Sequence, residues 1–138
     1  KNPLKKNLVI ADCGTILSVT KLNSHGSIIG GQLCPGFLTQ LKSMEVYTKN
    51  LKVPEKYEIP IQNFLINTED ALLRGVMNSM TGMISSLFNP LKDILIICGG
   101  DSNLITKIMK VNYQYIINTP NLVMEGMIMH CESQKKLF

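Results

Sequence analysis

One stretch of the chain constrains its fold more than any other: the continuous apolar run from Asp93 to Cys98, followed at once by Gly99-Gly100-Asp101. A run this short and apolar, bounded by glycines, predicts a β-strand. Helical spacing follows to about Met109, and the residues from Tyr113 to Ile117 predict another strand. Strands and helices in one chain of this length indicate a single α/β or α+β domain.

The first third of the chain has a different pattern, with short β-type runs separated by tight turns. Strands are predicted at Asn7–Ala11, Ile16–Leu22 and Ser27–Leu33. The sequences Asp-Cys-Gly-Thr and Asn-Ser-His-Gly supply the turns between them. We therefore expect three antiparallel strands, followed by a helix whose apolar residues recur at Phe37, Leu38, Leu41 and Met44.

The strongest helix signal begins at Asn67, which can cap a helix, while Glu69 and Asp70 suit its positive first turn. Asn89-Pro90 ends it. The predicted core-facing stripe is Leu72, Val76, Met80, Met83, Ile84 and Leu87.

Two glycines, Gly75 and Gly82, interrupt this helix at a cost of roughly 1 kcal/mol each relative to alanine. Close backbone packing is expected to compensate, and a dimer contact is one candidate. The preceding residues from Tyr47 to Ile66 are predicted to form an ordered surface loop. Pro120 is predicted at the first position of a last helix, which ends at about Glu132.

Composition excludes several classes of function. With 138 residues, 45% of them hydrophobic, the chain can form about one domain. A nucleic-acid binder is not expected, because the net charge is only +4, Arg74 is the single arginine and tryptophan is absent. The longest apolar strings are too short to span a bilayer. Four separated cysteines without a C-x-x-C pair suit buried thiols in a reducing cytoplasm.

Two glycine-containing turns could carry chemistry. Asp12 ends a predicted strand and is followed by Gly14 and Thr15, an arrangement that can hold a metal ion and phosphate oxygens. A solvated aspartate in an ordinary β-turn explains the same residues equally well. Gly99 and Gly100 lie between a strand and a helix, where a nucleotide could bind, although a simple aspartate-capped helix is the better reading of that turn alone. Together, the two turns argue for a phosphate site at the strand ends.

The same turns belong to a longer series of short motifs. Read in order, D-C-G-T, G-G-Q-L-C-P-G, T-K-N-L, N-T-E-D-A-L-L-R-G, C-G-G-D and P-N-L-V-M-E-G resemble the second half of the type III pantothenate kinases. The resemblance covers nearly the whole chain. Each motif is modest alone, but six in the right order at similar spacing make a specific signal.

This resemblance implies a ribonuclease-H-like fold of the actin-like ATPase superfamily, with a mixed sheet of about five strands flanked by helices. Residues 1–138 would then be a single actin-like ATPase domain, the C-terminal half of a kinase whose N-terminal half lies outside this chain. The implied activity is ATP-dependent phosphorylation of pantothenate to 4'-phosphopantothenate, the first step of coenzyme A biosynthesis. The implied assembly is a cytoplasmic homodimer.

The resemblance also implies roles for particular residues. Asp12 would lie near the phosphates and a monovalent cation, K⁺ or NH₄⁺, and would be the metal-binding residue, with ATP bound as the Mg²⁺ complex. Gly14 and Thr15 would line the phosphate loop, Gly99 and Gly100 would lie at the nucleotide, and Thr68 would contact pantothenate. No catalytic residue is expected in this half, because the family carries its first phosphate loop and its proposed catalytic aspartate in the N-terminal half.

Other interpretations remain open. An isolated kinase half would be inactive, because phosphoryl transfer needs groups from both sides of the cleft. A non-catalytic regulatory or interaction protein could retain the same fold, and a related sugar or acetate kinase is a third possibility. His25 and His130 lack ligand partners at suitable spacing, so zinc is not expected. The methionines suit core packing, and Met124, Met127 and Met129 could instead pack at a dimer seam.

Overall fold

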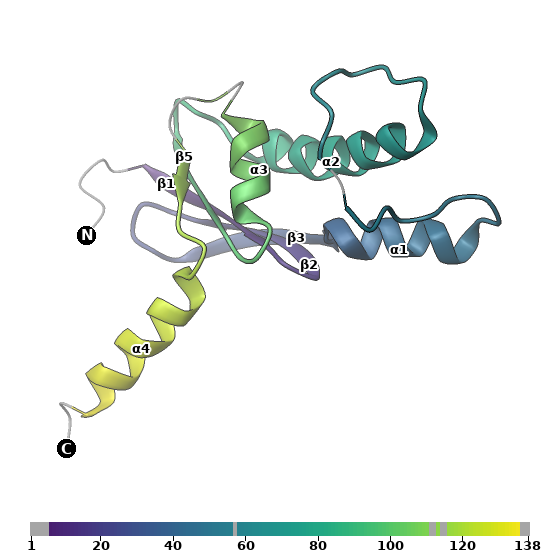
Figure 1. The fold of residues 1–138 in the computed structure, drawn as a ribbon. Coiled ribbons are helices and arrows are strands. Elements are labelled where there is room, and N and C mark those ends of the chain that lie inside the picture. Colours follow the sequence, from purple (N-terminus) through teal and green to yellow (C-terminus); the bar gives the residue numbers. More distant parts are fainter. Residues whose placement is uncertain (1–5, 57, 111–112, 114–115, 136–138) are drawn as a thin grey trace.

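A computed structural model describes residues 6–56, 58–110, 113 and 116–135 of the chain. Within them, the elements are five strands, which form one mixed sheet, and four helices (Figure 1). In chain order the elements are β1 (Asn7–Cys13), β2 (Ile16–Leu22), β3 (Ile28–Pro35), α1 (Phe37–Tyr47), α2 (Thr68–Leu87), β4 (Asp93–Cys98), α3 (Ser102–Met109), β5 (Ile116–Asn118) and α4 (Leu122–Lys135).

The strands lie in the order β3-β2-β1-β4-β5. The first three form an antiparallel meander, while β4 and β5 run parallel to β1. Parallel pairing requires a crossover between strands, and α3 supplies the one between β4 and β5. The predicted α/β, ribonuclease-H-like fold with a mixed five-stranded sheet is confirmed.

Helices α1, α2 and α3 lie on one side of the sheet (Figure 1). The alternating inward residues of β1, Val9, Ala11 and Cys13, are all fully buried beneath them. One continuous core joins these residues to Phe37 of α1 and Ile105 of α3. The strand ends are therefore fixed by a packed layer behind them.

Helix α2 begins where the sequence predicts, because the side-chain oxygen of Asn67 accepts hydrogen bonds from the N–H groups of Glu69 (2.8 Å) and Asp70 (3.4 Å). Its buried face differs from the predicted stripe. The buried residues are Leu73, Val76, Met77, Met80 and Ile84, whereas Leu72, Met83 and Leu87 pack partly buried at the edges of the core.

Gly75 and Gly82 do not have the close packing that the sequence suggested. A β-carbon on either residue would meet no atom within 4 Å. Both glycines therefore lie on an open face of α2, and nothing within the described residues offsets their cost in helix stability.

Other boundaries also differ from expectation. Pro120 lies in a turn before α4, which begins at Leu122, because the Pro120 carbonyl accepts a hydrogen bond from Gly99 N–H (3.1 Å). Strand β3 extends to Pro35, at the sheet edge where a missing N–H is tolerated. Strand β5 begins at Ile116, and Tyr113 lies outside it; residues 114 and 115 of the predicted strand fall outside the described residues.

A charged network anchors the end of the sheet at which β1 and β4 begin. Asp93 is almost fully buried and accepts hydrogen bonds from Lys21 Nζ (2.9 Å), Asn7 Nδ2 (3.1 Å) and Asn89 N–H (2.9 Å). Burial alone would raise the pKa of Asp93, but these donors outweigh it and hold the pKa below its ordinary value. The Asp93 carboxylate therefore has a structural role.

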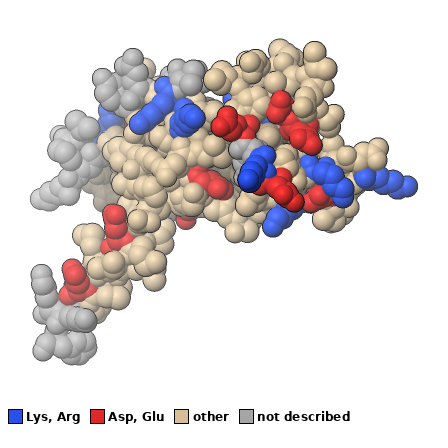
Figure 2. All heavy atoms as spheres, in the orientation of Figure 1, with Lys and Arg blue, Asp and Glu red and all other residues tan. Residues whose placement is uncertain are grey.

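Helix α4 projects away from the rest of the protein (Figure 1), and Figure 2 shows that its visible surface is mostly uncharged. Met124, Met127 and Met129 are each at least 60% exposed. An isolated helix of this length is marginal in water, so α4 presents an apolar surface suited to a partner. None of the described helices is long and apolar enough to cross a membrane.

Candidate functional site

The carboxyl ends of β1 and β4 lie side by side. These parallel strands pair Asp12 with Cys98, so the turns that follow them, Gly14-Thr15 and Gly99-Gly100, leave the same edge of the sheet. The structure thus brings together five of the residues singled out in the sequence. This is the edge at which ligands collect in α/β sheets.

Gly99 makes the closest approach in this region. It has φ +88°, and a β-carbon on it would lie 2.5 Å from Oδ1 of Asp12 and 2.6 Å from the carbonyl oxygen of Cys13. Any side chain would be strained at this φ and would also push against the aspartate. The contact therefore requires glycine and places the β4 turn directly against the Asp12 carboxylate.

The Gly14-Thr15 turn is held by the start of α1. The carbonyl oxygen of Thr15 accepts hydrogen bonds from Gly36 N–H (2.8 Å) and from the Thr39 hydroxyl (2.7 Å). A β-carbon on Gly36 would overlap the carbonyl oxygen of Gly14. Gly36 is therefore a structural residue that holds α1 beside the site.

Two of the glycine N–H groups are already used within the chain. Gly14 N–H donates to Ile16 O (3.3 Å), and Gly99 N–H donates to Pro120 O (3.1 Å). Their role is therefore to shape the two turns. Thr15 and Gly100 are exposed, and a β-carbon on Gly100 would meet no atom within 4 Å, so these two positions are open to a ligand.

The start of α3 is joined to the end of β1, because Asp101 N–H donates to the carbonyl oxygen of Cys13 (2.9 Å). The sequence suggested Asp101 as a helix cap, but its side chain makes no capping hydrogen bond. Burial instead raises the pKa of the Asp101 carboxyl. Asp101 therefore lies beside the end of β1, and its carboxyl is disfavoured in the ionised form.

Buried hydroxyl groups lie near the same strand ends without a hydrogen-bond partner among the described residues. They are Ser102 Oγ, at the first residue of α3, and Thr119 Oγ1, in the turn after β5. Sequence reasoning missed both. Their position directly after the β4 turn and β5 was the available signal, but their unpaired state depends on packing.

Two thiols lie within this region and are kept neutral. Burial raises the pKa of Cys13 to about 12, with smaller contributions from Cys98, Asp101 and Asp12. Burial and the charge of Asp12 raise the pKa of Cys98 to about 11. Neither thiol is suited to act as a nucleophile or metal ligand at neutral pH.

Thr68 is not joined to this cluster by any described hydrogen bond. It is the exposed first residue of α2, directly after the Asn67 cap.

The cluster can supply one carboxylate ligand to a cation, but not a complete metal site. No group of three His, Cys, Asp or Glu side chains suited to a metal ion occurs among the described residues. A hard divalent cation would need most of its ligands from phosphate oxygens and water, which is how Mg²⁺ is commonly bound with nucleotides. Asp12 fits that shared arrangement.

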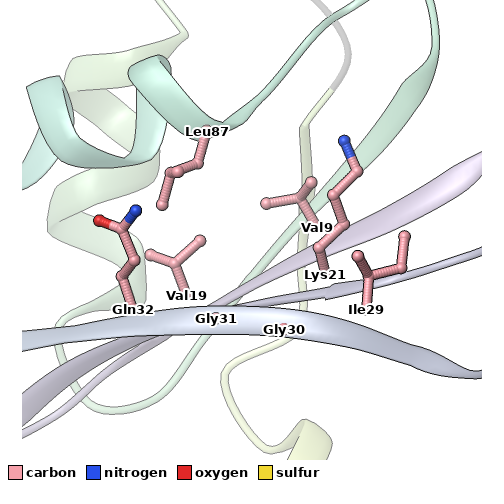
Figure 3. Close-up of a pocket in the computed structure, with 8 residues that line it drawn as sticks. All are labelled: Val9, Val19, Lys21, Ile29, Gly30, Gly31, Gln32 and Leu87. Atoms are coloured by element: carbon pink, nitrogen blue, oxygen red, sulfur yellow. The ribbon is translucent and has the colours of Figure 1, made fainter.

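A separate small hollow lies between the sheet and the end of α2. Figure 3 shows the side chains of Val19 and Gln32 below Leu87, with Lys21 on the other side of the hollow. Its volume of about 140 Å³ is below the ordinary range for a ligand site. The one cation among its lining residues, Lys21, is already paired with Asp93, so this hollow is poorly suited to a nucleotide.

Comparison with known proteins identifies the family. The family model described as Type III pantothenate kinase matches residues 2–89, more than half of the chain. The chain belongs to this family. The resemblance read from the short motifs is thereby confirmed.

Individual relatives agree. The chain is similar to type III pantothenate kinases from Porphyromonas gingivalis, at 26% identity over 127 residues covering 87% of this chain and 51% of the relative. It is also similar to the kinase from Acinetobacter baumannii, at 30% identity over 125 residues covering 89% of this chain and 49% of the relative. The chain therefore spans about half the length of the curated relatives it matches.

A solved structure confirms the fold. The crystal structure titled as a conserved putative Baf family transcriptional activator from Campylobacter jejuni matches 97% of this chain and 61% of its own chain. The TM-score is 0.73 at 18% sequence identity. At this identity the match supports the fold alone.

Proposed function

We propose that this chain forms the C-terminal lobe of an ATP-dependent pantothenate kinase. The complete protein phosphorylates pantothenate to 4'-phosphopantothenate, the first step of coenzyme A biosynthesis, in the cytoplasm. The isolated lobe does not turn over substrate. The observation that carries the proposal is the contact between Gly99 and the Asp12 carboxylate at neighbouring strand ends.

Each residue has a physical role in this proposal. Asp12 supplies a negatively charged oxygen to the cation that accompanies the phosphates, Mg²⁺ or a monovalent K⁺ or NH₄⁺. Gly14 and Gly99 hold the two turns in shape, since their N–H groups are bonded within the chain. The exposed residues Thr15 and Gly100 are the positions that contact the phosphates and the nucleotide.

Ser102 and Thr119 extend the proposed site. A buried hydroxyl without a partner costs free energy that a bound ligand or an ordered water can recover. Ser102 follows β4, which pairs with the Asp12 strand, and Thr119 follows β5, which pairs with β4. We assign them to nucleotide binding together with the two glycine turns.

The chemical step depends on the other lobe. Phosphoryl transfer is catalysed by positioning and by stabilisation of charge from both sides of the phosphates. This chain supplies one wall of the ATP cleft. The general base and the first phosphate loop come from the N-terminal half that the family implies. No residue of this chain is assigned as a catalytic base.

The same proposal includes a homodimer in which Thr68 contacts pantothenate. The open face of α2 at Gly75 and Gly82 and the exposed methionines of α4 are apolar or small surfaces without packing inside the chain. Such surfaces suit contacts with a second subunit or lobe.

A coupled assay of ADP formation by the intact gene product tests this function. ADP should form only when pantothenate is present and should require K⁺ or NH₄⁺. Acetate and simple sugars serve as control acceptors. Equal ADP formation without pantothenate rejects the proposal, and binding of an ATP analogue without turnover of any acceptor favours a non-catalytic protein.

A further inference from the structure

The two faces of the sheet are covered unequally. Along β1, the residues that face the helices are fully buried, whereas Leu8 and Ile10, which point to the opposite face, are only partly buried. The register places Ile94 and Ile96 of β4 beside them, and these two side chains are also only partly buried. We call this opposite side of the sheet the outer face.

The outer face is apolar from one edge of the sheet to the other. Ile117 of β5, beside Ile96, is 47% exposed, and Leu33 of β3, beside Ser18, is 74% exposed. Asp12 is the one charged residue among the outer-face positions of the five described strands. Parallel strands that are apolar on both faces are typical of sheets covered on both sides.

The described helices leave this face open. Helices α1, α2 and α3 lie on the other side of the sheet, and α4 projects away from it (Figure 1). A contiguous apolar surface of this kind marks a site of contact with another part of a protein. The outer face therefore requires a cover that these helices do not supply.

We propose that the N-terminal half of the complete protein docks on the outer face and covers it with the apolar stripe of an amphipathic helix. This inference rests on the proposed function, which takes the chain as one lobe of a kinase. The chain spans 51% and 49% of two relatives, so the remaining sequence is long enough for a second lobe. Amphipathic helices are the elements that cover the faces of parallel strands.

Tethering favours this occupant over a second copy of the chain. A preceding segment joins the fold at β1, which begins at Asn7, next to Leu8 on the outer face. A segment linked so closely has an effective concentration of about millimolar at this surface. A separate chain has no such advantage at ordinary protein concentrations.

The position of Asp12 connects this surface to the candidate site. Leu8, Ile10 and Asp12 alternate along β1, so the carboxylate lies at the end of the apolar row, on the same face. Gly99 meets it there. A lobe docked on the outer face therefore lies beside the candidate phosphate site, and its docking contacts set the distance from Asp12 to the groups across the cleft.

The first test is hydroxyl-radical footprinting of the intact gene product, with oxidation located by tandem mass spectrometry. Each residue's oxidation rate is divided by its rate in the urea-unfolded protein. Ile10 and Ile96 should be oxidised as slowly as Val9 and Leu95, their neighbours on the buried face of the same strands. Leu91, which is exposed before β4, is the control that should be oxidised rapidly.

The second test identifies what covers the face. Ile117→p-benzoylphenylalanine in the intact gene product, after irradiation, should form a cross-link within one chain to a peptide of the N-terminal half. The same probe in place of Val46, which is exposed on α1, is the control for cross-links that form without docking. Mass spectrometry locates each cross-link, and gel electrophoresis separates monomers from cross-linked dimers.

Three results would overturn the inference. The first is oxidation of Ile10 and Ile96 as rapid as that of Leu91, which would show an open face. The second is a cross-linked dimer from the probe at Ile117, which would assign the face to a second copy. The third is a gene product without a segment before this chain, which would also reject the proposed function.

The ADP assay distinguishes failure of this inference from failure of the proposed function. Pantothenate-dependent ADP formation by a protein whose outer face is oxidised rapidly rejects the docking surface alone. A protected outer face, cross-linked to the N-terminal half, in a protein that phosphorylates no acceptor supports the docking surface and rejects the kinase function.

Discussion

Gly99 and Asp12 are in contact across two parallel strand ends: a β-carbon on Gly99 would lie 2.5 Å from Asp12 Oδ1. The two residues are 87 positions apart in the sequence, yet the pairing of Asp12 with Cys98 makes their meeting unavoidable. A carboxylate held against a side-chain-free turn leaves room for phosphate oxygens and a cation.

Alanine substitutions at Gly99 and Gly26 should distinguish the stability cost of the Asp12 contact from the cost of a positive φ alone. Gly26 and Gly99 both have φ +88°, but a β-carbon on Gly26 would meet nothing within 4 Å. Gly26→Ala should lower the free energy of unfolding by about 1 kcal/mol, the ordinary cost of this φ. Gly99→Ala should lower it by about 2 kcal/mol more, because its β-carbon meets Asp12 and Cys13.

Urea denaturation of the two variants measures this difference. Equal losses of stability in Gly26→Ala and Gly99→Ala would show that the Asp12 contact is absent in solution.

The Asp93 network should make stability depend on pH. Because the pKa of Asp93 is lowered in the folded protein, its contribution is present above its ordinary value of 3.8 and is lost as the pH falls through the folded value. At pH 7, Asp93→Asn should cost about 2 kcal/mol, since Lys21 loses its charged partner. The difference from wild type should shrink in acid.

An exposed ion pair provides the control for this prediction. Lys52 Nζ lies 3.9 Å from Glu45 Oε1, and the lysine side chain is 77% exposed. Glu45→Gln should change the free energy of unfolding by less than about 0.5 kcal/mol. A loss in Asp93→Asn as small as this one, measured by urea denaturation, would contradict the anchoring role.

The pH dependence of stability that Asp101 contributes should be opposite to that of Asp93. Its pKa is raised by burial, so the ionised carboxyl is disfavoured in the folded state and stability falls as the pH rises above 3.8 through the folded value. Asp101→Asn should therefore raise the thermal unfolding midpoint at pH 7 and leave it unchanged at about pH 3. A lower midpoint at pH 7 would show that the carboxylate makes favourable contacts.

Alkylation should distinguish Cys131 from the two buried cysteines, Cys13 and Cys98. Cys13 and Cys98 are buried with pKa values raised to about 12 and 11, whereas Cys131 lies exposed on α4. Iodoacetamide at about pH 8 should therefore modify Cys131 first and leave Cys13 and Cys98 unmodified until the protein unfolds. Peptide mass spectrometry reads this order, and early modification of Cys13 would contradict its burial.

Much of the fold could be predicted because local signals agree with the tertiary structure. Asn67 caps α2 as expected, and the apolar run from Asp93 to Cys98 is a strand. The spacing of apolar residues failed to predict which side chains are buried where packing against neighbouring elements determines burial. Leu73 and Met77 are buried in place of Leu72 and Met83, because α2 packs against α1 and α3 as well as the sheet.

The candidate site was predictable in its main feature and not in its details. Acidic and glycine residues at two strand ends are visible in sequence, and parallel pairing brings them together. The use of Gly14 and Gly99 N–H groups within the chain, and the unpaired hydroxyls of Ser102 and Thr119, follow only from the packed structure. The position of Pro120 before α4 was missed, because its carbonyl is fixed by a contact distant in sequence.

The most direct measurement is pantothenate-dependent ADP formation by the intact gene product carrying Asp12→Asn, with its circular dichroism compared with that of wild type. Removal of the charge with retention of shape should lower kcat by about 100-fold or more while the fold is unchanged. An Asp12→Asn protein that phosphorylates pantothenate at the wild-type rate would contradict the assignment of this strand-end cluster to the nucleotide.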